Sequence, residues 1–482
     1  MNKTIRHTAV FTLLLVLALL LRATWVQFHD ATALADDKKN RRKVMAQYSA
    51  PLGDIIVAGD AVTGSKRSRS GDLAYQRTYK DGALYSAVTG YSSQVYGATQ
   101  LEGIYQKLLD GSDTRLKSPL DTLTNKRADP GDVLTTIDPA VQKAGFKALG
   151  DKKGAAVAID PKTGRILGMV STPSYDPSRI SGSTDGDAWK QLTSDEDKPM
   201  VNRAMRQPLP PGSTFKLVVA AAALEDGLYD SVDEKTKSPN PYTLPGTRTV
   251  MKNEISSAPC ENASLRTALQ WSCNNVFTKL AVDLGEDKLR AQAEKFGFNA
   301  DKLDVPVRAS ESVYPKGMDK SSLALTGMGQ FDVTATPLQI AMVSAAIANG
   351  GELKSPHMVS KTTDSDGNVL RDFDDSTGSE RVISESTAEQ LQSAMRTVVE
   401  KGTATSAKID GATVGGKTGT AQHGVGNKKT PYAWFTSYAK GSDGKEVAVA
   451  VIIESSKTAR SEVSGNGLAG PVAQAMMKAA LR

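Results

Sequence analysis

The chain has 482 residues and a formal net charge of +6, from 59 basic and 53 acidic side chains. This near balance of charge, without a basic helix that carries interleaved aromatic residues, argues against a nucleic-acid-binding protein. The four histidines and two cysteines form no group with metal-ligand spacing, so we expect no metal and no cofactor. The length allows a membrane anchor and about two domains.

An apolar run near the N-terminus covers residues 8–21 and follows basic residues. Its length and charge order fit either the core of a signal peptide or a short membrane helix. The small residues at 33–35 resemble a cleavage site, but they lie far beyond the run. We therefore expect a cytoplasmic tail at 1–7, an uncleaved single-pass anchor in the cytoplasmic membrane at 8–28, and the remainder of the chain outside.

A second basic run, residues 38–43, lies on the other side of the apolar segment. By charge alone it competes for the cytoplasmic side, although long domains cross the membrane largely regardless of this bias. We expect this run to form a solvated helix face. The alternative is contact with anionic lipid headgroups or wall polymer.

Residues 29–135 are polar and rich in strand patterns, which predicts a small strand-rich pedestal domain with a mobile loop at 63–71. From residue 136 onward, helical patterns alternate with short antiparallel strand patterns, as is typical of an α+β domain. The predicted helices cover 140–149, 265–284 with an interruption around Ser272, 336–348 and 467–481, and the predicted strand pairs join 155–159 to 166–170 and 433–438 to 447–453.

Three short motifs follow one another in this second domain. Ser213 and Lys216 form a Ser-x-x-Lys motif directly after Pro-Pro-Gly, Ser-Cys-Asn follows at 272–274, and Lys-Thr-Gly-Thr at 417–420. This ordered set is typical of an acyl-transfer site whose serine nucleophile is activated by lysine. The candidate catalytic residues are Ser213, Lys216, Ser272, Asn274 and Lys417, and the candidate substrate-binding residues are Thr418, Gly419 and Thr420.

The spacing of the first motif suits this chemistry. Ser213 is a favourable N-cap, and a helix that starts there places Ser213 and Lys216 on one face, within reach of each other. A lysine can act as the base for a serine when desolvation and a nearby cation, here Lys417, favour its neutral form. A Ser-His-Asp site is a poor alternative, because only His357 and His423 lie outside the N-terminal segment. We expect His423 on a surface loop or at the cleft rim.

The motifs and their flanks resemble those of class B penicillin-binding proteins, which are monofunctional peptidoglycan D,D-transpeptidases, and most of all the actinobacterial penicillin-binding protein A type. The resemblance covers roughly residues 75–455 and includes the flanking segments 154–169, 202–204, 327–330 and 336–341. It implies a serine β-lactamase-like transpeptidase domain at 136–482, in which an antiparallel sheet packs with helices beside a helical lobe. It also implies a dimerisation-like pedestal at 29–135 and an N-terminal membrane helix.

The resemblance implies a role for each catalytic candidate. Ser213 would attack the carbonyl of the penultimate D-alanine in a peptidoglycan stem peptide and expel the terminal D-alanine, while Lys216 takes the serine proton. Ser272 would relay protons to the leaving group, and Asn274 would hold Lys216 and the substrate amide. Lys417 would supply positive charge near Ser272.

The third motif would bind the substrate. Thr418 and Thr420, on either side of Gly419, would hold its carboxylate, and the backbone N–H groups of Ser213 and Thr420 would form the oxyanion hole. An amine of a neighbouring stem peptide would then attack the acyl-enzyme, and penicillin would acylate the same serine. Because the pedestal is too short to contain a glycosyltransferase domain, the resemblance implies a multi-pass membrane glycan polymerase of elongation or division as the partner.

The second motif departs from the Ser-Asp-Asn of related enzymes, because Cys273 is its middle residue. The only other cysteine is Cys260. An exported domain meets an oxidising environment, so we expect a disulfide between the two, worth about 3 kcal/mol on the chain-entropy model. The alternative is a pair of reduced, buried cysteines. Either way the role of Cys273 is expected to be structural.

Three other functions share these residues. A D,D-carboxypeptidase would use water in place of the acceptor amine, and the motifs do not separate the two reactions. A β-lactamase or β-lactam sensor would use the same site. A non-catalytic scaffold of a wall-synthesis complex is disfavoured because all three motifs are intact.

Overall fold

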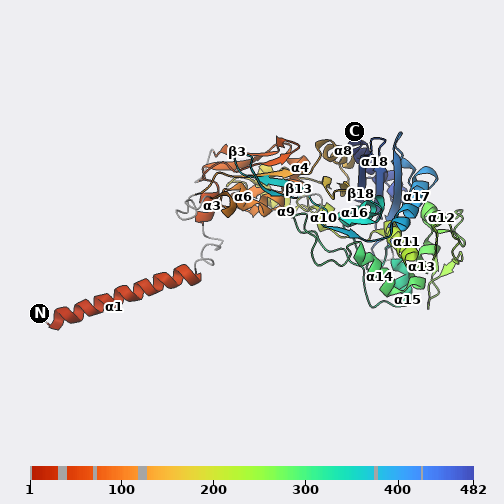
Figure 1. Cartoon of the computed structure of the whole chain (residues 1–482), viewed down its shortest axis with the longest axis horizontal. Helices are drawn as coiled ribbons and strands as arrows, with labels where there is room; N and C mark the ends of the chain where they lie inside the picture. Colours follow the sequence, from red (N-terminus) through yellow and green to blue (C-terminus); the bar gives the residue numbers. More distant parts are fainter. Residues whose placement is uncertain (1–2, 31–40, 69–72, 118–126, 374–377, 425–426) are drawn as a thin grey trace.

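The structure is a computed structural model that describes all residues except 1–2, 31–40, 69–72, 118–126, 374–377 and 425–426. Helix α1 (Lys3–Trp25), continued by the turn η1 (Val26–Asp30), extends away from the folded part of the chain (Figure 1). Among the described residues it is the one helix long and apolar enough to cross a membrane, and an anchor and a signal sequence meet this description equally. The cleavage-like residues 33–35 lie outside the described part, and the end of the second basic run opens α3 (Arg41–Gln47).

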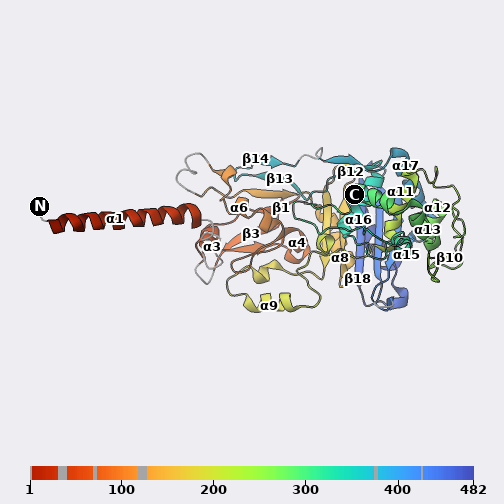
Figure 2. The same cartoon turned by 90° about the horizontal axis from the view of Figure 1, so that it is seen from below.

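The domain next to α1 is built on a five-stranded sheet in the order β14-β13-β7-β1-β2. β1 and β7 pair in parallel, and the other neighbours pair antiparallel. Two of its strands, β13 and β14, come from far later in the chain, so the pedestal is completed by a segment that returns from the second domain (Figure 2). The strands are β1 (Ile55–Val57), β2 (Asp60–Ala61), β7 (Asp132–Thr135), β13 (Val359–Thr363) and β14 (Val369–Asp372).

The predicted mobile loop at 63–71 is wrong for its first half. Residues Thr63–Arg67 form β3, which pairs antiparallel with β4 (Tyr75–Tyr79), while residues 69–72 lie outside the described part. The polar pattern concealed a strand because Thr63 is buried but satisfied: its hydroxyl accepts from the backbone N–H of Ile55 at 2.7 Å and from Arg77 at 3.0 Å. The pedestal also has helices and short strands, namely α4 (Gly82–Thr89), β5 (Ser92–Ser93), β6 (Gly97–Ala98), α5 (Gln100–Ile104), α6 (Gln106–Leu109), η2 (Thr114–Leu116), η3 (Pro177–Ile180) and α9 (Gly186–Ser194).

A buried ion pair lies in the middle of the pedestal. The Arg77 side chain is fully buried, and its Nε donates to Glu102 Oε1 at 2.6 Å. Its other nitrogens donate to the Gly53 carbonyl at 2.7 Å and to Thr63. Burial, the largest single influence, lowers the pKa of Arg77, but the charge and hydrogen bond of Glu102 together with Tyr79 and Asp54 outweigh it and raise the pKa, so the guanidinium stays charged inside the domain.

The second domain is built on an antiparallel sheet in the order β16-β17-β18-β8-β9. Adjacent residues of β17 show its two faces: Thr436 bonds to Ser344 of α16, and Ser437 bonds to Met477 of α18. Helices α8 and α18 therefore cover one face, and α16 and α17 cover the other (Figure 1). The elements are α8 (Pro139–Leu149), β8 (Lys153–Ile159), β9 (Ile166–Thr172), α16 (Pro337–Ala348), α17 (Glu385–Lys401), β16 (Thr413–Ala421), β17 (Tyr432–Lys440), β18 (Glu446–Ser455) and α18 (Gly470–Ala480).

A helical lobe lies beside β16 and completes the predicted α+β fold, which is confirmed. The helix predicted at 265–284 is interrupted at Ser272, as expected, and the predicted helices and strand pairs of this domain are all present. The lobe and the connecting segments contain α10 (Arg203–Arg206), η4 (Gly212–Phe215), α11 (Lys216–Glu225), β10 (Tyr242–Thr243), β11 (Val250–Met251), α12 (Leu265–Trp271), α13 (Asn274–Leu284), α14 (Glu286–Lys295), α15 (Lys320–Thr326), β12 (Glu352–Lys354), β15 (Ser379–Arg381), η5 (Thr405–Ala407), η7 (Arg460–Glu462) and η8 (Gly465–Ala469).

Candidate active site

Ser213 lies in a tight turn at the start of the helical lobe. The turn η4 is a 3₁₀ helix, and the α-helix α11 begins only at Lys216, so the prediction that Ser213 caps the helix is wrong. The reason is the Pro-Pro-Gly segment, which enters the turn with Gly212 at a positive φ of 54°. Ser213 is 6% exposed, so it is buried together with the other residues of the turn.

Close backbone contacts hold this turn on both sides. The N–H of Gly212 donates to the carbonyl of Gly329 at 3.0 Å. Gly329 has a φ of 66°, and a Cβ there would lie 2.2 Å from the Gly212 oxygen, so only glycine fits. On the other side, a Cβ at Gly419 of β16 would lie 3.1 Å from the carbonyl oxygen of Pro211. The nucleophile turn is therefore clamped between the third motif and residues 327–330.

Lys216 connects the first motif to the second. Its side chain is fully buried, and its Nζ donates to the Ser272 carbonyl at 2.8 Å, to Ser272 Oγ at 3.2 Å and to Asn274 Oδ1 at 2.7 Å. Within the described residues it makes no hydrogen bond to Ser213, the contact that the sequence predicts. In this state the amine is satisfied by the second motif instead.

Ser272 lies at the break between α12 and α13. Its backbone is left-handed, with φ 59° and ψ 42°, a conformation that costs a non-glycine residue about 1–2 kcal/mol. This break turns the hydroxyl into the site, where it receives hydrogen bonds from Lys216 and, at 3.0 Å, from Lys417 Nζ. The Ser272 hydroxyl thus bridges the two lysines.

The third motif lines the site along β16. Lys417 is fully buried and also donates to the Thr418 carbonyl at 3.0 Å. Thr418 is 8% exposed, and its hydroxyl forms a hydrogen bond with the Thr403 hydroxyl at 2.9 Å. Thr420 follows two residues later on the same strand, whose antiparallel partner is β17. The three motifs that are far apart in the sequence are therefore brought together.

The environment lowers the pKa of both lysines. For Lys216 the main cause is burial and the second is the charge of Lys417, which together hold the pKa well below its usual value. Burial lowers the pKa of Lys417 to about 7. The sequence predicted the lowered pKa of Lys216 from burial and from the charge of Lys417, but it did not predict the lowered pKa of Lys417. The charge of Glu254, which was not among the candidates, raises the pKa of both lysines.

These shifts predict a bell-shaped pH profile for acylation. Lys216 must be neutral to accept a proton, so the rate rises as the pH passes its lowered pKa. Lys417 must be charged, so the rate falls again as the pH rises through about 7. Because the charge of Lys417 lowers the pKa of Lys216, Lys216 loses its proton first. The rate of labelling by a fluorescent penicillin measures both limbs, and a rate that keeps rising into strongly alkaline pH would contradict the charge assigned to Lys417.

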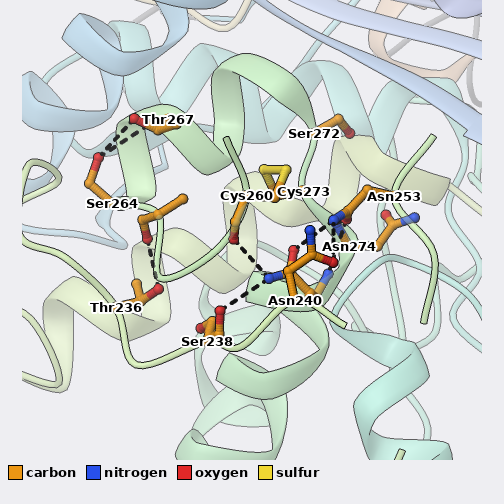
Figure 3. Close-up of a disulfide and its surroundings, with 12 residues drawn as sticks. Thr236, Ser238, Asn240, Asn253, Cys260, Ser264, Thr267, Ser272, Cys273 and Asn274 are labelled. Atoms are coloured by element: carbon orange, nitrogen blue, oxygen red, sulfur yellow. Dashed lines mark hydrogen bonds between the residues drawn. A yellow bond between two sulfur atoms is a disulfide. The ribbon is translucent and has the colours of Figure 1, made fainter. Parts of the chain in front are cut away.

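The second motif is stabilised by groups outside it. Cys260 and Cys273 are joined in a disulfide, the pairing expected from the sequence (Figure 3). Cys273 occupies the N-cap of α13 without a capping side-chain bond. Instead Asn253 Oδ1 accepts from the N–H groups of Asn274 at 2.7 Å and Asn275 at 3.3 Å, and so caps the helix from another loop.

A second amide completes this support. Asn275 is fully buried, and its Nδ2 donates to the carbonyl oxygens of Ser238, Pro239 and Cys260. Asn253 and Asn275 were both missed in the sequence. Asn275 follows the motif directly, which was a usable signal, but Asn253 acts across 21 positions and had none.

His423 is not part of the catalytic group. Its ring stacks on Tyr432 with centroids 4.0 Å apart, and Nε2 lies 2.7 Å from the Thr430 carbonyl. No group of three or more histidine, cysteine or acidic side chains in the described part of the chain could hold a metal ion.

Comparison with known proteins places this geometry in a family. Residues 154–478 match the penicillin binding protein transpeptidase domain, and residues 52–133 match the penicillin binding protein A dimerisation domain. The chain is 36% identical to the peptidoglycan D,D-transpeptidase PbpA of Mycolicibacterium smegmatis, over 100% of this chain and 99% of the relative. The PbpA of Mycobacterium tuberculosis is 35% identical over the same shares.

Solved structures agree with the sequence comparison. Penicillin-binding protein A from M. tuberculosis, in its penicillin G acyl-enzyme complex, superimposes with a TM-score of 0.81 at 34% identity, covering 90% of this chain and 100% of that one. Its ceftriaxone acyl-enzyme complex gives a TM-score of 0.82, covering 91% of this chain and 100% of that one at 34% identity. The chain therefore belongs to the penicillin-binding protein transpeptidase family, as a relative of the actinobacterial PbpA enzymes.

Proposed function

We propose that this protein is a peptidoglycan D,D-transpeptidase that cross-links stem peptides through an acyl-enzyme on Ser213 and is acylated there by β-lactams. The observation that carries the proposal is the Ser272 hydroxyl held between Lys216 and Lys417 at 3.2 and 3.0 Å, where Lys216 begins the helix that directly follows the Ser213 turn. It provides a buried relay of protons between a base and a charged group. The acyl-enzyme complexes of the M. tuberculosis relative support the same chemistry.

The proposed mechanism uses each motif in turn. Neutral Lys216 takes the proton of Ser213 as its Oγ attacks the substrate carbonyl, and Ser272 passes a proton to the leaving D-alanine amine. Asn274 orients Lys216, to which it bonds at 2.7 Å, and Lys417 keeps positive charge beside Ser272. Thr418 and Thr420, beside Gly419, bind the substrate carboxylate, and the backbone N–H groups of Ser213 and Thr420 stabilise the oxyanion.

The cellular setting is part of the proposal. Residues 1–7 form a cytoplasmic tail, 8–28 a single-pass anchor and 29–135 most of the pedestal, and 136–482 form the transpeptidase domain outside the membrane apart from the segments, such as β13 and β14, that complete the pedestal. The apolar α1 and the disulfide, which suits an oxidising compartment, support this placement. The two matched segments are a dimerisation domain and a transpeptidase domain, so we expect a multi-pass membrane glycan polymerase as the partner that supplies the glycan strands.

Acylation by a fluorescent penicillin tests this function. The full chain in detergent, wild type beside Ser213→Ala, is followed by intact mass over hours. We expect a long-lived adduct on the wild type and none on Ser213→Ala, because Ser213 is the proposed nucleophile. Rapid release of the label would indicate a β-lactamase, and stem-peptide hydrolysis without amide formation would indicate a carboxypeptidase. If the wild type forms no adduct, the remaining alternative is a non-catalytic scaffold of a wall-synthesis complex.

A further inference from the structure

The loop that follows β11 is fixed against the second motif. The Asn253 side chain accepts from the N–H groups of Asn274 and Asn275, and Asn274 Nδ2 donates to the Lys252 carbonyl at 2.9 Å (Figure 3). The disulfide joins the far end of the same loop to the N-cap of α13. The next residue, Glu254, is therefore held at a defined place beside the active site.

Glu254 has no structural partner there. Its side chain is exposed, and its carboxylate makes no hydrogen bond or ion pair with any residue that the structure describes. Yet its charge reaches both Lys216 and Lys417, and among the described carboxylates it is the one that raises the pKa of both. Glu254 directly follows Asn253 and Lys252, which bond to Asn274, and Asn274 in turn bonds to Lys216, so the exposed carboxylate of Glu254 lies at the rim of the site.

The positive charge of this site repels the acceptor amine of the transfer reaction. A primary amine with a pKa near that of lysine, about 10.4, is uncharged in only about one molecule in 10³ at neutral pH. It therefore arrives as an ammonium ion, close to the cationic Lys417, which repels it. Water, the competing nucleophile, carries no charge and meets no such repulsion. A carboxylate at the rim of the active site offsets the repulsion between Lys417 and the ammonium ion, and it has no such effect on water.

We propose that Glu254 binds the ammonium group of the acceptor stem peptide and thereby favours aminolysis of the acyl-enzyme over hydrolysis. This rests on the proposed transpeptidase function. The bound ammonium first releases one proton to water. The neutral amine then attacks the carbonyl carbon of the Ser213 ester, so that a C–N bond forms and the C–Oγ bond breaks. Its second proton passes through Lys216 to the Ser213 oxygen, which leaves an amide and the free serine.

The partition of one acyl-enzyme between two nucleophiles tests this role. The full chain in detergent is acylated with a thioester of a D-alanyl peptide, and the ratio of amide to acid is measured by mass spectrometry. The acceptors are Nα-acetyl-lysinamide, which is cationic, and hydroxylamine, which is mostly uncharged at neutral pH. Because both products come from the same intermediate, a change in the acylation rate cancels in the ratio.

Glu254→Gln is expected to lower the ratio about tenfold for the cationic acceptor, a difference of about 1.4 kcal/mol, and to leave the hydroxylamine ratio within about twofold. Added salt should lower the cationic ratio of the wild type but not of the variant. Glu261→Gln is the matched control, because it removes an exposed carboxylate from the same loop, next to Cys260, and Glu261 is not among the groups that shift the pKa of Lys216 or Lys417.

Two results would overturn the proposal. An unchanged ratio for the cationic acceptor would show that Glu254 does not bind it, and an equal fall for both acceptors would assign Glu254 to the shape of the loop. A wild type that forms no adduct on Ser213 at all removes the proposed function itself, and this inference with it. If the wild type is acylated but Glu254→Gln leaves the amide-to-acid ratio unchanged, only the inference about Glu254 is overturned.

Discussion

Replacing Lys216 by methionine is expected to slow acylation of Ser213 by about 10²- to 10⁴-fold, the usual contribution of a general base. Methionine is similar in length and apolar, so it fills the buried site next to Phe277, over whose ring the Lys216 amine lies at 5.4 Å. Among the residues that the structure describes, Lys216 forms no ion pair, so its removal leaves no buried carboxylate without a partner, and the fold should persist. What is lost is the amine that accepts the proton and bonds to Ser272 and Asn274.

The measurement is the second-order rate of labelling by a fluorescent penicillin, with the melting temperature as a check of folding. Lys216→Arg is the matched control, because arginine keeps a positive charge but does not act as a base at neutral pH. It should be as slow as Lys216→Met. Labelling of Lys216→Met at the wild-type rate would exclude Lys216 as the base.

Replacing Arg77 by methionine is expected to destabilise the pedestal by about 3–5 kcal/mol, because Glu102 would remain buried without its partner. Both side chains of the pair are almost fully buried, with 0% and 1% exposure. The same change removes the hydrogen bonds to the Gly53 carbonyl and the Thr63 hydroxyl, which tie together the segments before β1 and in β3.

Hydrogen exchange of β1 and β3 measures this effect, since the second domain need not unfold with them. Arg115→Met is the control: it breaks an exposed ion pair with Asp113, which should contribute little. Removing the charge on both sides, in Arg77→Met with Glu102→Leu, should restore part of the protection. Unchanged exchange in Arg77→Met would mean that the pair does not support the pedestal.

The chemistry of the site was predictable because motif residues are local signals. Ser213 with Lys216, and Lys417 with its neighbours, can be recognised within a few positions, and the lowered pKa of Lys216 follows from burial and from the charge of Lys417. The 3₁₀ turn at Ser213 was not predictable, because the contact of Gly212 with Gly329 joins segments far apart in the sequence. Asn253 and Glu254 were not predicted for the same reason, because they act on residues that are distant in the sequence.

The same distinction between local sequence signals and contacts between distant segments applies to the fold. Strand pairs of the second domain follow apolar patterns, as at β17 and β18, and were predicted correctly. The pedestal depends on buried polar groups, so β3 carries a polar pattern and was mistaken for a loop. No local pattern could show that β13 returns to pair with β7, because only the folded sheet brings Val359 opposite Thr135.

The strand order also determines when each sheet can form during synthesis, which proceeds from the N-terminus to the C-terminus. β8 and β9 are synthesised early, but the other neighbour of β8 in the sheet is β18, which ends at Ser455. The pedestal likewise lacks β13 until Thr363 has appeared. Neither sheet can close on a nascent chain, and for most of synthesis each exposes an unpaired apolar edge that favours aggregation. Assembly of this protein is therefore a late event, which leaves a long interval in which chaperones are needed.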